Sequence, residues 1–117
     1  MLSALAAGDT LPERVWRDEG SRVVVGICTI RLSLPGCTSL KDKRGVLKSL
    51  MARVHNQFNV SIAEVGDNDS WHSAVLGVAA VANEPAYVSG LLNRVAQWIE
   101  ESRLDVSLVD LEIELVK

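Results

Sequence analysis

The chain has 117 residues, of which 48% are apolar and 23% charged, and this balance excludes disordered and fibrous proteins and indicates a single folded domain. Its formal net charge of −3 argues against a general nucleic-acid binder, although local basic patches stay possible. Two cysteines, Cys28 and Cys37, are too few for a disulfide framework, so we expect thiols in a reducing cytosol. No apolar run is long enough for a membrane span, and we therefore expect a cytoplasmic protein.

Residues 1–21 are predicted to form an N-terminal arm ahead of one domain at residues 22–117. Thr10 and Glu13 have the spacing of a capping box, which would begin a short helix. The alternative is a disordered leader, because chain termini are often loosely held. The helical alternative would let the arm dock on this or a neighbouring subunit.

Residues 22–34 are predicted to form a central strand, because β-branched residues dominate there and Pro35-Gly36 ends the run. One face of this strand is apolar throughout and is assigned to the core: Val24, Gly26, Cys28, Ile30, Leu32 and Leu34. The opposite face is apolar only in its first half and carries Val23, Val25, Ile27, Thr29 and Arg31.

Ser39 is the predicted N-cap of a helix that runs to about Gln57, with Asp42 placed to return a capping-box bond. An apolar arc at helical spacing assigns one side of this helix to the core, namely Leu40, Leu47, Leu50, Met51 and Val54. Lys43 lies near that arc, and we expect its aliphatic stem to carry the charge out to solvent.

Residues 58–67 and 71–83 are predicted to be two strands of a hairpin, joined by the turn cluster at 66–70. The second of these strands is apolar on both faces, which places it at the centre of a sheet or in an interface. Asn83 is the predicted cap of a second helix, with Pro85 in its first turn. The last strand, residues 105–117, is expected to turn one set of side chains inward, namely Ser107, Val109, Leu111, Ile113 and Leu115. Its outward set is Asp110, Glu112 and Glu114.

The predicted order is therefore β-α-β-β-α-β. With right-handed crossovers, this order places two helices on one face of a four-stranded antiparallel sheet of strand order 4-1-3-2. The predicted fold class is α+β, with the ferredoxin-like arrangement.

Three segments carry a resemblance to a known family. They read Val-Gly-Ile-Cys-Thr-Ile-Arg-Leu at 25–32, Leu-Pro-Gly-Cys-Thr-Ser-Leu-Lys-Asp-Lys-Arg at 34–44 and Phe-Asn-Val-Ser-Ile-Ala-Glu-Val-Gly-Asp at 58–67. On these residues the chain resembles the YlxP-like family of small bacterial proteins, a domain of unknown function. The resemblance implies a ferredoxin-like fold and carries over no catalytic residue. The family's genes often lie near those for translation initiation and ribosome maturation factors, which implies a role near the ribosome or its RNA.

The start of the first helix is the first candidate site. Lys41, Arg44, Lys48 and His55 fall on one side of a helical wheel, and loop amides from residues 36–39 would add donors at a helix N-terminus. These four side chains are the predicted anion- or RNA-binding residues. The alternative is an ordinary solvated helix face.

The sheet face without helices is the second candidate. Base stacking there is disfavoured, because aromatic residues are scarce and the acids of the last strand would repel phosphate. An apolar patch beside an acidic edge fits a subunit contact better. The predicted oligomer-interface residues are Val23, Val25, Ile27 and Arg31, and Arg31 is expected to pair with one of those acids.

The hairpin turn is the third candidate, because Glu64, Asp67, Asp69 and His72 could approach a divalent metal. Turn chemistry accounts for these residue types, and their spacing matches no known metal loop, so neither a metal nor a cofactor is predicted. A reactive role for Cys37 would need a lowered pKa that the sequence does not establish. No catalytic residue is assigned.

The sequence thus favours a non-enzymatic binding or assembly protein that contacts RNA or the ribosome through the basic helix face, with no membrane contact. The alternative is a structural homo-oligomer that binds a partner protein through its open sheet face. A binder of a small phosphorylated ligand, or an enzyme acting on one, ranks third.

Overall fold

The computed structural model describes residues 21–102 and 105–116. Its elements are β1 (Val24–Ser33), α1 (Leu40–Gln57), β2 (Ser61–Gly66), β3 (Ser73–Ala82), α2 (Pro85–Ser102) and β4 (Ser107–Val116). The predicted N-terminal arm lies outside the described residues except for Ser21. Within the described ranges, no helix is long and apolar enough to cross a bilayer.

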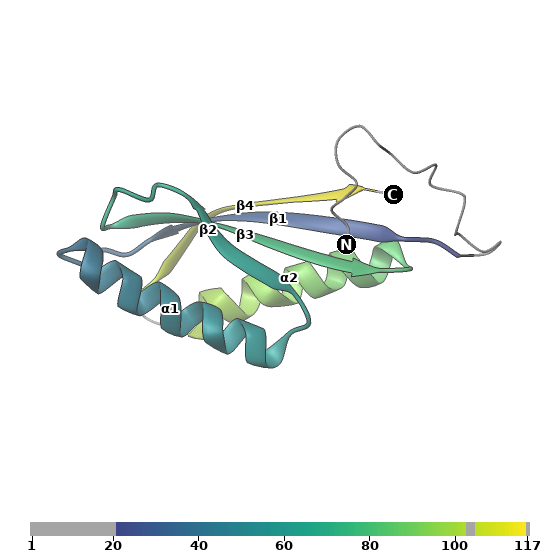
Figure 1. Cartoon of the computed structure of the whole chain (residues 1–117), viewed down its shortest axis with the longest axis horizontal. Coiled ribbons are helices and arrows are strands. Elements are labelled where there is room, and N and C mark those ends of the chain that lie inside the picture. The colour runs from purple at the N-terminus through teal and green to yellow at the C-terminus, as the bar shows by residue number, and fades with distance from the viewer. Residues whose placement is uncertain (1–20, 103–104, 117) are drawn as a thin grey trace, which may run out of the picture.

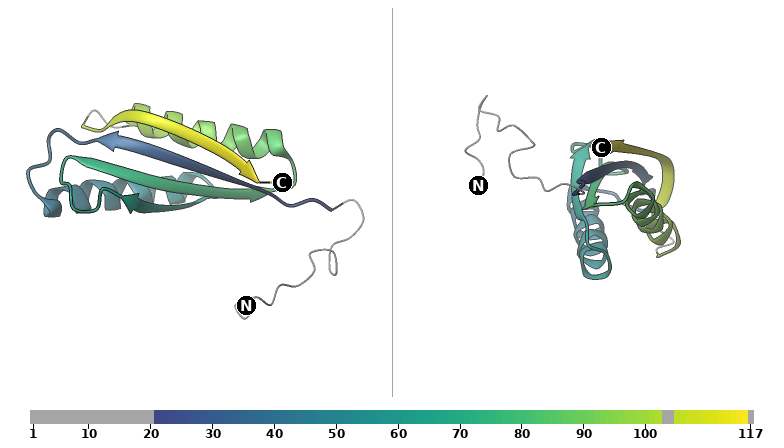
Figure 2. Two further views of the ribbon diagram at one scale, coloured as in Figure 1. Left: turned by 90° about the horizontal axis from the view of Figure 1, so that it is seen from above. Right: turned by 90° about the vertical axis from the view of Figure 1, so that its right-hand side faces the viewer.

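The four strands form one antiparallel sheet in the order β2-β3-β1-β4, which is the predicted order counted from the other edge. Both helices cover the same face and leave the other face of the sheet open (Figures 1 and 2). The predicted ferredoxin-like α+β fold is therefore confirmed, including the central position of β3. The strands are a few residues shorter than predicted, most clearly β2.

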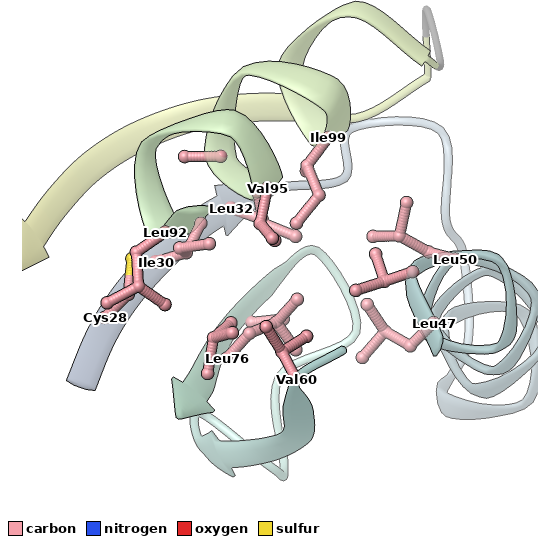
Figure 3. Close-up of a cluster of buried hydrophobic side chains, with 14 of the residues drawn as sticks. Cys28, Ile30, Leu32, Leu47, Leu50, Val60, Leu76, Leu92, Val95 and Ile99 are labelled. Atoms are coloured by element: carbon pink, nitrogen blue, oxygen red, sulfur yellow. The ribbon is translucent and has the colours of Figure 1, made fainter. Parts of the chain in front are cut away.

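Burial alternates along β1 as its sequence pattern predicts, with every second residue inside. Figure 3 shows Cys28, Ile30 and Leu32 of β1 beneath α2, while Leu47 and Leu50 of α1 close the other side of the core. Burial raises the pKa of the Cys28 thiol to about 11, so this cysteine is a core residue rather than a nucleophile. Neither cysteine of the chain is part of a disulfide.

Gly26 leaves room on β1 for side chains of α2. A Cβ atom at this position would overlap Val88 and would lie 2.8 Å from Leu92 Cδ1, so a side chain here would force these side chains of α2 to shift. The glycine is therefore a packing residue of the core.

The pairing of β4 with β1 differs from the predicted alternation. The ladder pairs Arg31 with Asp110 but the next residue of β1 with Leu108, which leaves Val109 as the extra residue of a β-bulge. Val109 is consequently 60% exposed, so the prediction that Ser107 and Val109 face inward is wrong, and Leu108 packs against the core instead. The predicted inward residues beyond the bulge keep their orientation: Leu111, Ile113 and Leu115.

The second helix begins one residue later than the predicted cap implies. Pro85 is the first helical residue, so the residue before it, Glu84, holds the cap position, and its carbonyl accepts the Val88 N–H at 3.2 Å. The backbone carbonyl of Asn83 accepts a bond from Arg22 Nε at 3.3 Å, and Arg22 also pairs with Glu84 at 2.9 Å. The prediction of Asn83 as N-cap is therefore wrong.

Candidate functional site

The N-terminus of α1 is closed by the chain's own side chains. Ser39 is the N-cap, and its Oγ accepts the Asp42 N–H at 3.1 Å, as predicted. The Asp42 carboxylate returns to Thr38 rather than to Ser39, accepting from its Oγ1–H at 2.8 Å and its N–H at 3.1 Å. The Thr38 hydroxyl and amide, with smaller contributions from Ser39 and Lys41, lower the pKa of Asp42.

This capping occupies groups that were expected to receive an external anion. The Thr38 N–H is bonded to Asp42 and the Cys37 N–H is bonded to Leu34 O at 3.1 Å. The Asp42 carboxylate therefore takes the place that an anion would hold at this helix end. The prediction that these two loop amides donate to an external anion is therefore wrong. The candidate site consists of side chains on the helix.

The structure places Lys41, Arg44, Lys48 and His55 on α1 with all four side chains exposed. Among the described residues, the cations that form ion pairs are Arg22, Arg31 and Lys43. None of the four residues on this helix face forms one. The cationic face, as we name these four residues, is thus presented to solvent.

A groove lies directly beside the cationic face, between α1 and the edge strand β2, with a volume of about 460 Å³. Its floor is apolar and its rim is cationic, so it combines two kinds of recognition. The lining residues are Arg44, Leu47, Lys48, Met51, Ala52, His55, Ile62 and Glu64. Sequence reasoning missed this groove, because the packing of α1 on β2 is a tertiary feature.

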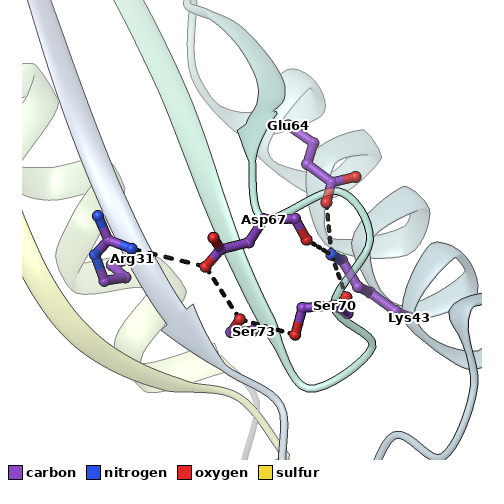
Figure 4. Close-up of polar contacts among 6 residues, drawn as sticks. All are labelled: Arg31, Lys43, Glu64, Asp67, Ser70 and Ser73. Carbon is purple, nitrogen blue, oxygen red and sulfur yellow. Dashed lines mark hydrogen bonds and ion pairs between the residues drawn. The ribbon is translucent and has the colours of Figure 1, made fainter.

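Lys43 does not extend to solvent as predicted. Its side chain is 2% exposed. Nζ donates to Asp67 O at 2.7 Å and Ser70 O at 2.6 Å and lies 2.7 Å from Glu64 Oε2 (Figure 4). The ammonium group has three protons, and three acceptors surround it. The hairpin turn therefore replaces water around Lys43, and the cation fastens α1 to the β2–β3 hairpin.

The acids of the hairpin are directed to different cations rather than to one metal. Asp67 Oδ2 lies 3.7 Å from Arg31 Nη1 and accepts the Ser73 hydroxyl at 3.0 Å, whereas Glu64 pairs with Lys43 (Figure 4). Arg31 was expected to pair with an acid of β4. Its ion pair is with Asp67 of the hairpin instead. Among the described residues, no group of three or more His, Cys, Asp or Glu side chains could hold a metal ion.

The open sheet face has two unlike halves. Val23 and Ile27 are 52% and 40% exposed, Val25 is half-buried and Arg31 is exposed, so the predicted oligomer-interface residues do lie on this face. A shallow hollow of about 410 Å³ continues the apolar surface across small residues such as Ala63 and Gly77. The acids of β4 line the other side.

These features define a small α+β protein with a cationic helix face, an adjoining groove and a half-apolar open sheet. A family model described as "Protein of unknown function (DUF503)" matches residues 25–113. The chain belongs to this family, in agreement with the YlxP-like resemblance.

The chain is similar to the uncharacterized protein YlxP of Bacillus subtilis (strain 168), with 38% identity over 77 residues, which cover 66% of this chain and 84% of that protein. Among solved structures it is similar to the de novo designed protein Foldit4, with a TM-score of 0.48 and 14% identity over 82% of this chain and 98% of that one.

Proposed function

We propose that the protein is a cytoplasmic, non-enzymatic binding module that docks on RNA, of the ribosome or a ribosome-associated transcript, through the cationic face of α1. The observation that carries this proposal is that Lys41, Arg44 and Lys48 share one exposed side of the helix and form no ion pair with a described residue. Exposed cations that form no ion pair keep most of their field for an external anion.

The arrangement of charges supports an oriented contact despite the net charge of −3. At 1.5 Å per residue, Lys41 and Lys48 lie about 10 Å apart along the axis, a length over which a nucleic-acid strand presents several phosphates. α1 packs on β2, whereas the exposed acids Asp110, Glu112 and Glu114 lie on β4, the opposite edge of the sheet. The acids therefore do not neutralise the cationic face.

Binding of a labelled single-stranded RNA to the full chain tests the proposal. If about three cations contact phosphates, the logarithm of affinity should fall with the logarithm of salt with a slope of about −2. The double variant Lys41→Glu, Arg44→Glu should lose most of this affinity and flatten the slope. Arg94→Glu, a single charge reversal of an exposed residue on α2, is the control for each of the two single reversals.

The proposal is contradicted if binding is absent, if it does not respond to salt, or if the single reversals behave like this control. Capture of the tagged protein from cells, with and without nuclease, tests the cellular partner. Ribosomal RNA should be recovered only from the untreated sample, and protein partners that survive nuclease would argue against an RNA contact.

A second candidate function is that of a structural homo-oligomer, for which the exposed apolar half of the open sheet is the supporting observation. Val23, Ile27 and Val81 are all exposed there, and apolar surface of this kind commonly marks a protein contact.

A further inference from the structure

The outer edge of β2 has no strand partner among the described residues, since β2 ends the sheet. The ladder itself identifies which backbone groups point outward. Leu34 N donates to His72 O at 2.8 Å, and β1 and β3 pair without a register shift from this point on. In an antiparallel ladder, residues alternate between bonding to one neighbour and to the other. The even-numbered residues of β3 therefore bond to β1, and the odd-numbered ones bond to β2.

The same alternation continues into β2. Ser61 and Ala63 pair with Ala79 and Gly77, which are odd-numbered residues of β3, so they bond inward. The residue between them and the residue after them, Ile62 and Glu64, direct their N–H and C=O groups away from the sheet. Their side chains point to the helix side and line the groove beside α1.

We propose that this edge accepts a short extended segment of a partner protein as an additional strand. Backbone bonds to Ile62 and Glu64 would fix its register, and alternate side chains would enter the groove, which is the usual division of roles in strand addition. Met51 and Ile62 form an apolar floor, so the segment presents an apolar residue there. Arg44 and Lys48 on the rim select acidic residues two positions away, on the same face of the segment.

A partner segment fits this edge better than β4 of a second copy, although β4 also presents apolar residues at alternate positions. In the folded chain α2 packs on β4. A second copy paired through β4, with its helices on the same side, would therefore bring its α2 into the space beside β2 that α1 occupies. An isolated strand carries no helix and avoids this overlap.

Amide hydrogen exchange of the full chain measures the predicted pairing directly. The probe is a soluble peptide of about seven residues in which Leu and Glu occupy every second position in turn, with Thr between them, so that both share one face of the strand. Its addition should slow exchange at Ile62 and Glu64 by about ten-fold or more, while Ser61 and Ala63 change little because they already bond to β3. Leu111 and Ile113, the outward residues of the β4 edge by the same alternation, are internal controls. Unchanged exchange in β2, or protection at β4 instead, would overturn the proposal.

Two further comparisons distinguish strand addition from simple charge attraction. A probe N-methylated at alternate residues should lose binding in one of its two possible patterns, whereas a charge-driven complex would tolerate both. Ala52→Glu adds bulk and negative charge at an exposed position of the groove and should lower the affinity for the probe by about ten-fold. Asn93→Glu, which adds the same negative charge on the exposed side of α2, is the control, and equal effects of the two variants would contradict the groove.

This inference stands apart from RNA binding, and the two can fail separately. Lys41 does not line the groove, so Lys41→Glu should reduce RNA affinity and leave the peptide complex unchanged. Peptide and RNA would share Arg44 and Lys48 and should compete. A rise in mass of the free protein with concentration that Ala52→Glu abolishes would assign the edge to a second copy and reject the partner segment.

Discussion

Lys43 shows how a single polar side chain determines the meeting of two elements. The position belongs to the buried side of α1, together with Leu47, Leu50 and Val54. A charge there is tolerated because the ammonium has both a carboxylate and two carbonyl oxygens as partners. Its charge therefore supports the structure of the hairpin and is not available to a ligand.

Lys43→Met should destabilise the fold by about 3 kcal/mol, because it leaves the Glu64 carboxylate and two turn carbonyls without their cation. Urea unfolding followed by circular dichroism measures this change. Lys48→Met is the matched control, since Lys48 is exposed, and should stay within about 0.5 kcal/mol. Equal effects of the two substitutions would contradict the structural role of Lys43.

At the scale of elements, the start of α1 depends on an ionised Asp42. Its pKa is lowered in the folded chain by the Thr38 and Ser39 bonds. A lowered folded pKa contributes stability above the unfolded value of about 3.9, and that contribution is lost as the pH falls through the folded pKa.

Asp42→Asn should therefore lower the melting temperature at neutral pH, and the difference from the unsubstituted chain should shrink as the medium is acidified below about pH 4. Melting curves across this range provide the measurement. Asp69→Asn, in the exposed hairpin turn, supplies the control for a charge change alone. A difference that stays constant into acid would show that the carboxylate charge is not what holds the helix start.

The contact between α2 and β1 depends on Gly26 in the same way. Gly26→Ala should cost about 1–3 kcal/mol, because the added methyl overlaps Val88 and Leu92. Gly45→Ala is an informative control, since an added Cβ on α1 meets nothing within 4 Å and should stabilise the helix by up to about 1 kcal/mol. Denaturant midpoints of the two variants should move in opposite directions, and a shared direction would refute close packing at Gly26.

At the scale of the whole molecule, the second candidate function requires that copies of the chain associate through the open sheet face. Ile27→Asp places a charge at the exposed centre of the apolar half without disturbing the core, because Ile27 is on the open side of β1. If the chain associates through this face, the mass measured by light scattering should fall from that of an oligomer to that of a monomer. An unchanged mass in the variant would exclude the face as the contact.

Much of the architecture could be predicted from the sequence because it depends on local periodicity. The helical spacing in α1 and the alternation in β1 each determine a buried side, and the turn cluster determines the hairpin. The bulge at Val109 could not be predicted, because a one-residue shift depends on the register with β1 and leaves no signal in β4 alone.

The candidate site was predictable to a smaller extent. The cationic face follows from helical spacing, and the structure leaves its side chains exposed. The role of Lys43 depends on its contacts with the distant hairpin. The bond from Thr38 to Asp42 depends on how the loop enters the helix. Neither contact follows from helical spacing. The groove beside β2 likewise exists only after α1 has packed on the sheet.

Both edge strands contain one irregular residue, Val65 in β2 and Val109 in β4, where the ladder register shifts. Such irregularities bend a strand and turn its outer amides out of line. The regular outer run of β2 is thereby limited to residues 61–64. The β2 edge consequently offers too little straight template for cross-β stacking, and fibre growth from this edge should require the sheet to open first, whereas β4 keeps a regular run over residues 110–116.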